Sequence, residues 1–425
     1  MVRLLFSRSC GEWLDFQPLQ MLGRLGNELV VPEEAELMPM PEGATLTLVP
    51  GRHCIGMDAN GEIVSLSQNP YNTEEDEEIF AVAALLPQGF TRTLLPAITD
   101  HGPTLPILGY TAVGVADDGT LMVAATQTDE DDRWNPRHYN TADLEELVAK
   151  RQEEFPRNQL IRQLSRCSLE YGCFTAQNIM YRRYEGGIPV SPVCNARCIG
   201  CLSLQEGGDC ESPQQRIKSS PAAKDAAEVA IAHLKSAEYP IVSFGQGCEG
   251  EPCLQGDLIS EIIRTVRAAT DRGTINMNTN AGSYENMQKI IDAGIDSLRV
   301  SMISAVDENY AKYHRPVNYT FADVRRAIAY AKQRGVKVAV NYLVYPGFND
   351  RLSELEAMVD FCQTHHIDQI QLRNLNIDPK IMTELYGEDE QGLGVPAMLD
   401  ILRENLPDTV IGSYSYPVDS CGKQK

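Results

Sequence analysis

The sequence predicts an α/β protein in which a partial (β/α)6 barrel follows a β-rich N-terminal domain. After Gly187, short β-branched runs alternate with longer amphipathic segments, a pattern typical of βα units around a parallel sheet. Before residue 140, short alternating runs are separated by Gly-, Asn- and Asp-rich turns, which is typical of β-structure. We therefore expect four parts: a β-rich domain at 1–140, a helical connector at 141–186, the partial barrel at 187–380, and a C-terminal helix and tail at 381–425.

Strands and helices are expected to alternate through the barrel. The expected strands are Ile188–Pro192, Ile241–Phe244, Thr274–Asn278, Ser297–Met302, Val336–Val344 and Gln369–Leu372. The expected helices are Ala222–Ser236, Leu254–Asp271, Ser283–Ala293, Phe321–Gln333, Leu352–His365 and Val395–Asn405. In barrels of this kind, chemistry collects on the loops that follow the C-terminal ends of the strands. We expect the functional residues at that edge.

Composition argues against a nucleic-acid-binding, membrane-spanning or disulfide-rich protein. The 425 residues carry 37 basic and 59 acidic side chains, and the resulting net charge of −22 argues against broad nucleic-acid binding. No apolar run approaches the roughly 20 residues that span a bilayer, and the N-terminus does not resemble a signal peptide, so a cytoplasmic protein without a membrane segment is expected. In that compartment, the 12 cysteines are expected to bind metal or pack rather than form disulfides.

Three cysteines form the pattern C-x3-C-x2-C just after the first expected barrel strand. Cys194, Cys198 and Cys201 place three thiolates within eight residues, enough to hold one face of a compact iron–sulfur cluster. A [4Fe–4S] cluster has four ligand positions, so three thiolates leave one iron open to a small molecule. The alternative is a structural zinc site with Cys210 or Cys248 as fourth ligand, although the x3 spacing is unusual for one.

This motif and its surroundings resemble the radical S-adenosylmethionine (SAM) superfamily over roughly residues 187–380. After the second expected strand, Gly250, Glu251 and Pro252 are similar to the family's Gly-Gly-Glu-Pro turn, although the segment before them is longer. The resemblance implies that this turn holds the amino group of SAM. It also implies further SAM contacts from later strand ends, at Asn278, Asn280, Arg299, Ser301, Asn341 and Gln371.

The resemblance implies a chemistry and two cofactors, a [4Fe–4S] cluster and SAM. An electron from the reduced cluster, delivered by a donor such as flavodoxin or ferredoxin, would break a carbon–sulfur bond of SAM. The resulting 5′-deoxyadenosyl radical would abstract hydrogen from a substrate. We favour a small molecule or cofactor precursor as substrate. A peptide- or protein-modifying enzyme, and a non-catalytic iron–sulfur electron carrier or sensor, remain alternatives, and the acidic charge counts against RNA.

The remaining candidates have weaker patterns. Cys248 lies in the turn after the second strand and is our candidate for a catalytic thiol. Buried packing is the competing interpretation for it and for the other unclustered cysteines, which would otherwise ligate an auxiliary cluster: Cys167, Cys173, Cys210, Cys253 and Cys421. Candidate substrate contacts follow strands four and six, where ordinary surface roles compete: Tyr310, Tyr313, His314, Arg315, Arg373 and Asn374.

Overall fold

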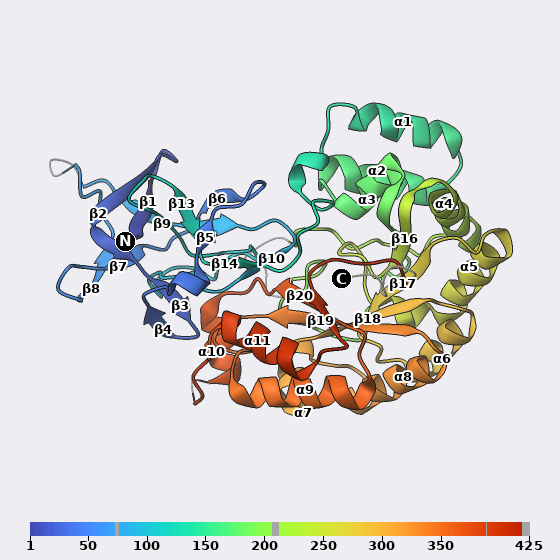
Figure 1. The fold of residues 1–425 in the computed structure, drawn as a ribbon. Helices are drawn as coiled ribbons and strands as arrows, with labels where there is room; N and C mark the ends of the chain where they lie inside the picture. Colours follow the sequence, from blue (N-terminus) through green and yellow to red (C-terminus); the bar gives the residue numbers. More distant parts are fainter. Residues whose placement is uncertain (73–75, 206–211, 388, 419–425) are drawn as a thin grey trace. The chain divides into compact units, whose positions relative to one another are not determined.

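The computed structural model describes residues 1–72, 76–205, 212–387 and 389–418. The chain forms two compact units, each assembled from separated parts of the sequence (Figure 1). The first unit contains Met1–Trp134, Leu343–Val359 and Leu372–Pro407. The second contains Asn135–Tyr342, Asp360–Gln371 and the residues from Asp408 onward. This division runs through the expected barrel segment, and the domain boundaries expected from the sequence remain predictions.

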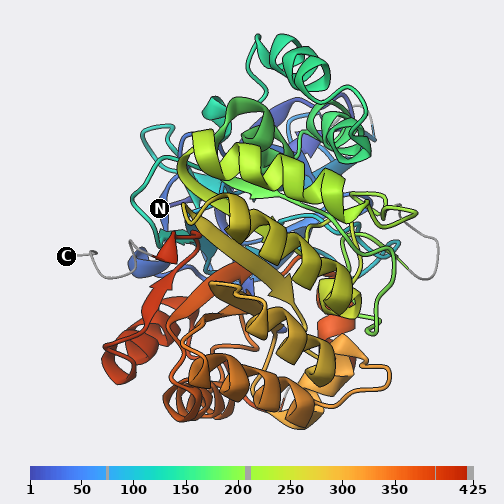
Figure 2. The same cartoon turned by 90° about the vertical axis from the view of Figure 1, so that its right-hand side faces the viewer.

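One seven-stranded sheet follows chain order from β15 to β21. Neighbouring strands whose pairing is resolved run parallel. In the pair β17 and β18, for example, Asn278 lies opposite Arg299. The sheet curls as a half-barrel (Figure 2), and the predicted fold class is confirmed. The strands are β15 (Arg183–Gly187), β16 (Glu238–Phe244), β17 (Thr274–Thr279), β18 (Ser297–Met302), β19 (Lys337–Val344), β20 (Gln369–Asn374) and β21 (Val410–Gly412).

Amphipathic helices connect the strands and cover one face of the sheet (Figure 2). In α5, Ile259, Ile262, Ile263 and Val266 are buried at the i, i+3, i+4, i+7 spacing of a single helical face. Neighbouring helices α4, α5, α6 and α8 pack side by side in that order. The helices are α4 (Ala223–Ser236), α5 (Gly256–Ala269), α6 (Tyr284–Asp292), α7 (Asp307–His314), α8 (Phe321–Gln333), α9 (Leu352–His365), α10 (Pro379–Tyr386) and α11 (Val395–Asn405).

The first barrel strand lies earlier than predicted. The expected strand at 188–192 is wrong, because β15 occupies Arg183–Gly187, a polar segment with no β-branched residue. The N–H of Ile188 still continues the ladder, with a 2.9 Å bond to the carbonyl of Ser243, and the buried residues 189–190 then leave it. The apolar run that predicted a strand is therefore the segment that follows it. The strand itself is polar in sequence and contains the buried Glu185, so it was not predicted.

Three further elements were not predicted, β21, α7 and α10. Each is short, with three residues in the strand and eight in each helix, which is less than the roughly 11–18 residues over which a helical pattern is read or the roughly 4–8 residues needed for a strand pattern. The six predicted helices all form, with ends within two residues of those expected. Periodicity thus located the long amphipathic elements and missed the short ones.

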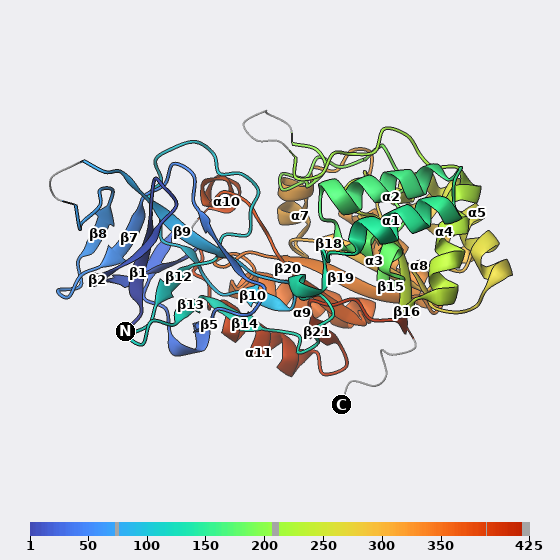
Figure 3. The same ribbon diagram turned by 90° about the horizontal axis from the view of Figure 1, so that it is seen from above.

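The helical connector consists of α1 (Leu144–Glu154), α2 (Gln159–Glu170) and α3 (Phe174–Tyr181). Helix α3 packs on β15 and α2 packs on α4, so the connector belongs to the half-barrel unit (Figure 3). Asn158 caps α2 by accepting a 3.1 Å bond from the N–H of Ile161, as expected for an N-cap asparagine.

The first unit is β-rich, as predicted for the N-terminal residues. Its largest sheet has the path β5–β13–β12–β1–β2–β7–β8, with β9 pairing both β1 and β6, and two small sheets, β11–β3–β4 and β10–β14, accompany it. The strands are β1 (Arg3–Arg8), β2 (Trp13–Met21), β3 (Gly23–Leu25), β4 (Glu28–Val30), β5 (Met38–Pro39), β6 (Thr45–Leu48), β7 (Cys54–Met57), β8 (Ile63–Leu66), β9 (Ile79–Leu85), β10 (Phe90–Arg92), β11 (Leu95–Pro96), β12 (Val113–Val115), β13 (Leu121–Val123) and β14 (Ala125–Gln127). Short 3-10 turns occur at Glu34–Glu36 and Pro136–His138.

Residues that follow β19 and β20 complete this first unit. The buried side chains of Arg52 and Asp378 form a 3.0 Å ion pair, and both are 2 % exposed. Asn374 donates to the carbonyl of Phe90 (3.0 Å) and accepts from the N–H of Arg92 (2.9 Å). These contacts join residues that are 326 positions apart in the sequence for Arg52 and Asp378, and 284 for Asn374 and Phe90. Among the described residues, no helix has the length and apolar character needed to cross a bilayer.

Candidate active site

The cysteine loop follows β15 and is held by main-chain bonds to the end of α7. The N–H of Arg197 donates to the carbonyl of His314 (3.1 Å), and the N–H of Val317 donates to the carbonyl of Asn195 (2.8 Å). The N–H of Ile199 donates to the Tyr313 carbonyl over 3.2 Å. The loop is therefore anchored just after Cys194 and on both sides of Cys198.

The three thiols of the loop are partly buried and differ in their neighbours. The sulfur of Cys198 lies 3.4 Å from Nδ1 of His314, while the sulfur of Cys201 accepts from Arg216 over 3.7 Å. Burial raises the pKa of the Cys194 thiol to about 11, and it also raises the pKa of Cys198. In the described chain, no three His, Cys, Asp or Glu side chains are arranged to hold a single metal ion.

This donor set fits an iron–sulfur cluster. Thiolates are the usual ligands of such clusters, and buried thiols become ligands when iron takes the place of their protons. Arg216, which also donates to Ser203 (3.1 Å), brings a positive charge beside Cys201. The negative charge of a thiolate-ligated cluster would be partly balanced by such a cation.

A single buried carboxylate joins the cysteine loop to the turn after β16. Glu249 Oε2 accepts from the N–H groups of Val190 (2.7 Å) and Ser191 (2.8 Å), and Oε1 accepts from those of Gly245 and Gln246 (both 2.7 Å). Burial raises the pKa of this carboxyl to about 7, while the four N–H groups favour its charged form. Beyond the ends of β15 and β16, this carboxylate accepts hydrogen bonds from the main-chain N–H groups of the two segments in place of strand-to-strand hydrogen bonds.

Gly250, Glu251 and Pro252 continue this connection. Gly250 must be a glycine, because a Cβ at this position would lie 2.1 Å from the carbonyl oxygen of Val193. The N–H of Glu251 donates to the same carbonyl over 2.8 Å. Pro252 opens the 3-10 turn Pro252–Gln255, which leads into α5. This turn therefore lies directly against the chain that enters the cysteine loop.

The side chain of Glu251 carries the connection on to the end of β17. Its carboxylate accepts from Thr279 Oγ1 (2.5 Å), from the N–H of Asn280 (2.7 Å) and from the N–H of Cys253 (2.9 Å). The amide of Asn280 in turn donates to Asn195 Oδ1, inside the cysteine loop, over 2.7 Å. The cysteine loop, the turn after β16 and the turn after β17 thus form one hydrogen-bonded assembly.

Asn278 holds the same edge of the sheet. Its amide donates to the carbonyl of Gly245 over 2.9 Å. Gly245 has φ of +81°, and a Cβ there would lie 1.9 Å from the Asn278 carbonyl oxygen, so only glycine fits. Asn278 is therefore occupied in shaping the turn after β16.

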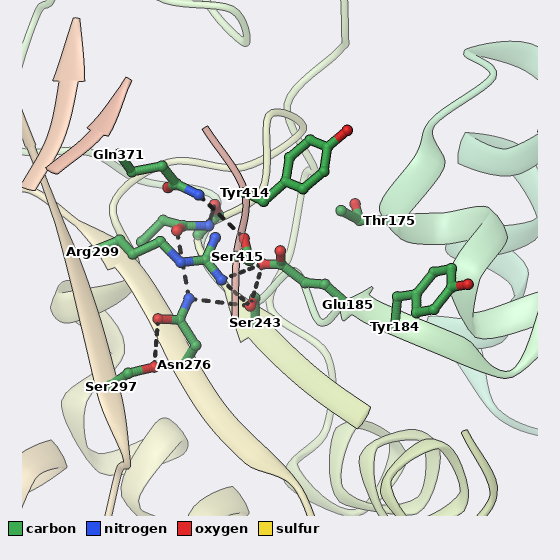
Figure 4. Close-up of polar contacts among 12 residues, drawn as sticks. Thr175, Tyr184, Glu185, Ser243, Asn276, Ser297, Arg299, Gln371, Tyr414 and Ser415 are labelled. Atoms are coloured by element: carbon green, nitrogen blue, oxygen red, sulfur yellow. Dashed lines mark hydrogen bonds and ion pairs between the residues drawn. The ribbon is translucent and has the colours of Figure 1, made fainter. Parts of the chain in front are cut away.

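The interior of the half-barrel is polar and contains a buried ion pair (Figure 4). Arg299 on β18 lies 2.7 Å from Glu185 on β15, and their side chains are 8 % and 5 % exposed. Burial disfavours the charged form of Glu185, but Arg299 and hydrogen bonds from Ser243 and Ser415 outweigh it and lower the pKa of the carboxyl. Because β15 and β18 are not neighbours in the sheet, this pair crosses the concave face.

The last predicted contacts lie on β18, β19 and β20. The amide of Asn341 donates to Ser301 Oγ over 3.4 Å, and both side chains are half-buried. Gln371 is buried, and its amide donates to the Ser413 carbonyl (3.2 Å) and to Ser415 Oγ (3.3 Å). The Oε1 atom of Gln371 is buried without a hydrogen-bond partner (Figure 4).

Cys248, the candidate catalytic thiol, is buried, with 3 % of its surface exposed. Cys253 is also buried, with its sulfur 3.9 Å from Asn280 Oδ1. Cys173 is half-buried beside Thr175. Cys210 and Cys421 lie outside the described residues, so an auxiliary cluster that uses them stays a prediction.

The candidate substrate residues have structural partners. Tyr310 is buried and stacks on His314 at 4.2 Å between ring centroids and on Phe321 at 4.4 Å. Arg315 ends α7 in a left-handed conformation with φ of +46°. Tyr313 is buried at the end of the same helix. Arg373 and Asn374 belong to the first unit, where Asn374 binds the main chain of β10.

Two important residues were missed from the sequence, Glu249 and Glu185. Glu249 lies in the segment that makes this turn longer than the family's plain form, and Glu185 lies in a stretch too polar to predict a strand. The only available signal was an acidic residue beside glycines and buried runs. That signal is too common to single out a buried carboxylate.

Part of the chain is similar in sequence to known proteins. Residues 188–362 match the family model of the radical SAM superfamily. A probable dual-specificity RNA methyltransferase RlmN of Flavobacterium johnsoniae is 28 % identical over 123 residues, which is 27 % of this chain and 34 % of that protein. The chain therefore aligns with about a third of that curated relative.

Solved structures give distant likenesses. Methylornithine synthase (PylB) has a TM-score of 0.39 and 16 % identity, covering 56 % of this chain and 68 % of that one. HydG of Carboxydothermus hydrogenoformans, an FeFe-hydrogenase maturase, has a TM-score of 0.38 and 15 % identity. The match covers 63 % of this chain and 68 % of the HydG chain. Streptococcus suis SuiB bound to precursor peptide SuiA has a TM-score of 0.35 and 15 % identity. The match covers 51 % of this chain and 44 % of the SuiB chain.

The matched segment is a radical SAM domain. It contains the cysteine loop, the turns after β16 and β17, and most of the half-barrel. The superfamily, the enzyme class that goes with it, and its two cofactors, a [4Fe–4S] cluster and SAM, are those that the sequence predicted. The roles of individual residues toward these cofactors remain predictions.

Replacing the buried carboxylate of Glu249 tests its connecting role. In Glu249→Gln, an NH2 group would face two N–H donors that now have an acceptor, so we expect a loss of about 3 kcal/mol in unfolding free energy. We also expect less iron bound after reconstitution. Urea denaturation and iron analysis measure the two effects.

The matched control is Glu238→Gln, an exposed residue at the start of β16. It should change neither stability nor iron content. Equal behaviour of the two variants would contradict the connecting role of Glu249.

Removing Arg299 tests the ion pair in the half-barrel. Arg299→Met leaves Glu185 buried without its cation, and we expect about 3–5 kcal/mol of destabilisation at neutral pH. Without Arg299, burial raises the folded-state pKa of Glu185 above its unfolded value. The penalty should therefore be large above that folded-state pKa and shrink as the pH falls through it.

Urea denaturation at neutral and mildly acidic pH measures this trend. Glu185→Gln combined with Arg299→Met removes both charges and should recover part of the stability. A double variant as unstable as Arg299→Met alone, at both pH values, would exclude the ion pair as the cause.

Proposed function

We propose that this chain is an enzyme that reductively cleaves SAM to a 5′-deoxyadenosyl radical and uses it to abstract hydrogen from a substrate. In this proposal Cys194, Cys198 and Cys201 are the cluster ligands. The supporting observation is the hydrogen-bonded assembly that joins the cysteine loop to the turns after β16 and β17 through Glu249, Glu251 and Asn280. A loop bound only to zinc for stability has no need of these buried acidic connections.

The cluster supplies the electron that breaks the carbon–sulfur bond, and the protein orients SAM and excludes water. We propose that the main chain around Gly250 and Pro252 receives the amino group of SAM, as the family resemblance implies. Glu251 has all its described bonds within the protein, so in our proposal it fixes that turn. Asn278 and Asn280 shape the neighbouring turns in the same way.

The rest of the SAM site is proposed on β18, β19 and β20. Ser301 and Asn341 are half-buried and already paired, and their polar atoms suit the hydroxyl groups of a ribose. The unpaired Oε1 of Gln371 is a hydrogen-bond acceptor that suits an adenine amino group. Arg299 contributes by orienting Glu185 in the polar interior.

The substrate is proposed to be a small molecule or cofactor precursor, with a ferredoxin or flavodoxin as electron donor. The curated relative is an RNA methyltransferase, but a net charge of −22 would repel an RNA backbone. A peptide or protein substrate is the alternative, since SuiB has been solved with its precursor peptide. The electron-carrier hypothesis differs from both because it requires no SAM cleavage.

Anaerobic reconstitution tests the proposal directly. With a loaded [4Fe–4S] cluster, SAM and dithionite, the chain should release 5′-deoxyadenosine and methionine, measured by liquid chromatography. Replacing Cys194, Cys198 or Cys201 by Ala should abolish both the cluster absorbance and the cleavage, because each removes one of three ligands. Cys10→Ala, at an exposed position in the first unit, is the control and should retain both.

A chain with a full cluster that releases no 5′-deoxyadenosine, with or without candidate substrates, would favour the electron carrier or sensor. Full cleavage by any of the three Ala variants would overturn the ligand assignment.

A further inference from the structure

A buried histidine lies against one of the three proposed cluster ligands. His314, the last residue of α7, is 1 % exposed, and its Nδ1 atom lies 3.4 Å from the sulfur of Cys198. The Nε2 atom, on the other side of the ring, is buried and has no hydrogen-bond partner among the described residues. The polar contact that this ring makes is therefore with a sulfur atom.

Aromatic packing fixes the orientation of this ring. The ring of His314 stacks on Tyr310 with centroids 4.2 Å apart, and Tyr313 meets it edge-on at 5.0 Å. Tyr310 in turn stacks on Phe321 at 4.4 Å. The main-chain carbonyl of His314 accepts from the N–H of Arg197 over 3.1 Å, which binds the backbone of the histidine to the cysteine loop. Because both the ring and the loop are held, the contact between the imidazole and the sulfur is fixed by the fold.

Iron binding decides which atom donates in this contact. A free thiol at Cys198 can donate, and its sulfur also lies 3.7 Å from the His314 carbonyl oxygen. A thiolate that ligates iron has lost its proton and can only accept. The contact with the imidazole then becomes a hydrogen bond when Nδ1 carries the proton, and Nε2 is the unprotonated nitrogen of that tautomer.

We propose that His314 is a positioning residue that donates a hydrogen bond from Nδ1 to the Cys198 thiolate and thereby raises the reduction potential of the cluster. Reduction adds one electron and increases the negative charge on the sulfur ligands. A hydrogen bond to sulfur becomes stronger as that charge increases, so it stabilises the reduced cluster more than the oxidised one. This inference rests on the proposed function, because it takes Cys198 as a cluster ligand.

The proposed ligands have different polar neighbours, which allows the effect of His314 to be measured by itself. The sulfur of Cys201 accepts from the guanidinium of Arg216 over 3.7 Å, and Arg216 is half-buried, so water weakens its effect on the cluster. The imidazole at Cys198 is buried and acts through one directed hydrogen bond, which a low dielectric strengthens. Changing His314 alone leaves the contact between Arg216 and Cys201 in place.

Replacing His314 by Phe tests the hydrogen bond. Phenylalanine keeps a ring that can stack on Tyr310, but it has no donor and also removes the unpartnered Nε2 atom. We expect the reduction equilibrium of the reconstituted cluster to become about tenfold less favourable, a fall of about 59 mV in midpoint potential for one electron. Anaerobic redox titration without SAM, followed by electron paramagnetic resonance of the reduced cluster, measures the potential. His314→Asn offers an amide N–H in place of Nδ1 and should recover most of the loss.

The matched control is His233→Phe. His233 on α4 is also buried, at 2 % exposure, and its Nδ1 atom has no partner among the described residues. Its Nε2 atom, however, lies 2.9 Å from the carbonyl oxygen of Tyr184, so this ring is bound to the main chain and not to a proposed ligand. The control should leave the midpoint potential unchanged.

Iron and sulfide analysis of each variant separates the outcomes. An unchanged potential in loaded His314→Phe, or an equal fall in His233→Phe, would overturn the inference. Loss of the cluster in both His314→Phe and His314→Asn would assign His314 a purely structural role and would also overturn it. The potential needs a bound cluster but no SAM cleavage, so a loaded chain that releases no 5′-deoxyadenosine contradicts the proposed function alone. An unaltered chain that binds no cluster contradicts both.

Discussion

The carboxylate of Glu249 is the interaction on which the site depends. Where β15 and β16 end, the main-chain N–H groups of Val190, Ser191, Gly245 and Gln246 lose strand partners, and buried N–H groups need acceptors. One carboxylate supplies all four. Three residues after Ser191 comes the first cysteine of the loop, so the position of the proposed cluster ligands is fixed by this buried charge.

The polar interior of the half-barrel follows a similar logic. Arg299 and Glu185 are buried together, and Ser243, Asn276 and Ser297 extend the network across the neighbouring strands (Figure 4). Buried charges are tolerated only when they are paired and hydrogen-bonded. A half-barrel filled in this way presents fixed dipoles at its centre, and such preorganised polar groups suit a charged cosubstrate better than an apolar core would.

The sequence predicted the long periodic elements and the cysteine motif, and it could not predict the carboxylates. Helices such as α5 repeat an apolar face over several turns, so their ends were placed within two residues. The first strand was misplaced because Glu185 is buried by an arginine 114 residues away. Arg299 and Glu251 were expected to contact SAM, and the structure gives both of them partners within the protein. Such pairings form only when strands that are distant in the sequence come together in the fold. The local sequence pattern around each residue therefore does not predict them.

The central claim is that three cysteines leave one iron of the cluster open to SAM. Electron–nuclear double resonance of the reduced protein with SAM labelled at its amino nitrogen and carboxylate oxygen measures this directly. The account predicts hyperfine coupling from both labels to the cluster, with loss of the signal when Cys198 is replaced by Ala. A fully loaded cluster whose spectrum is unchanged by labelled SAM would contradict it.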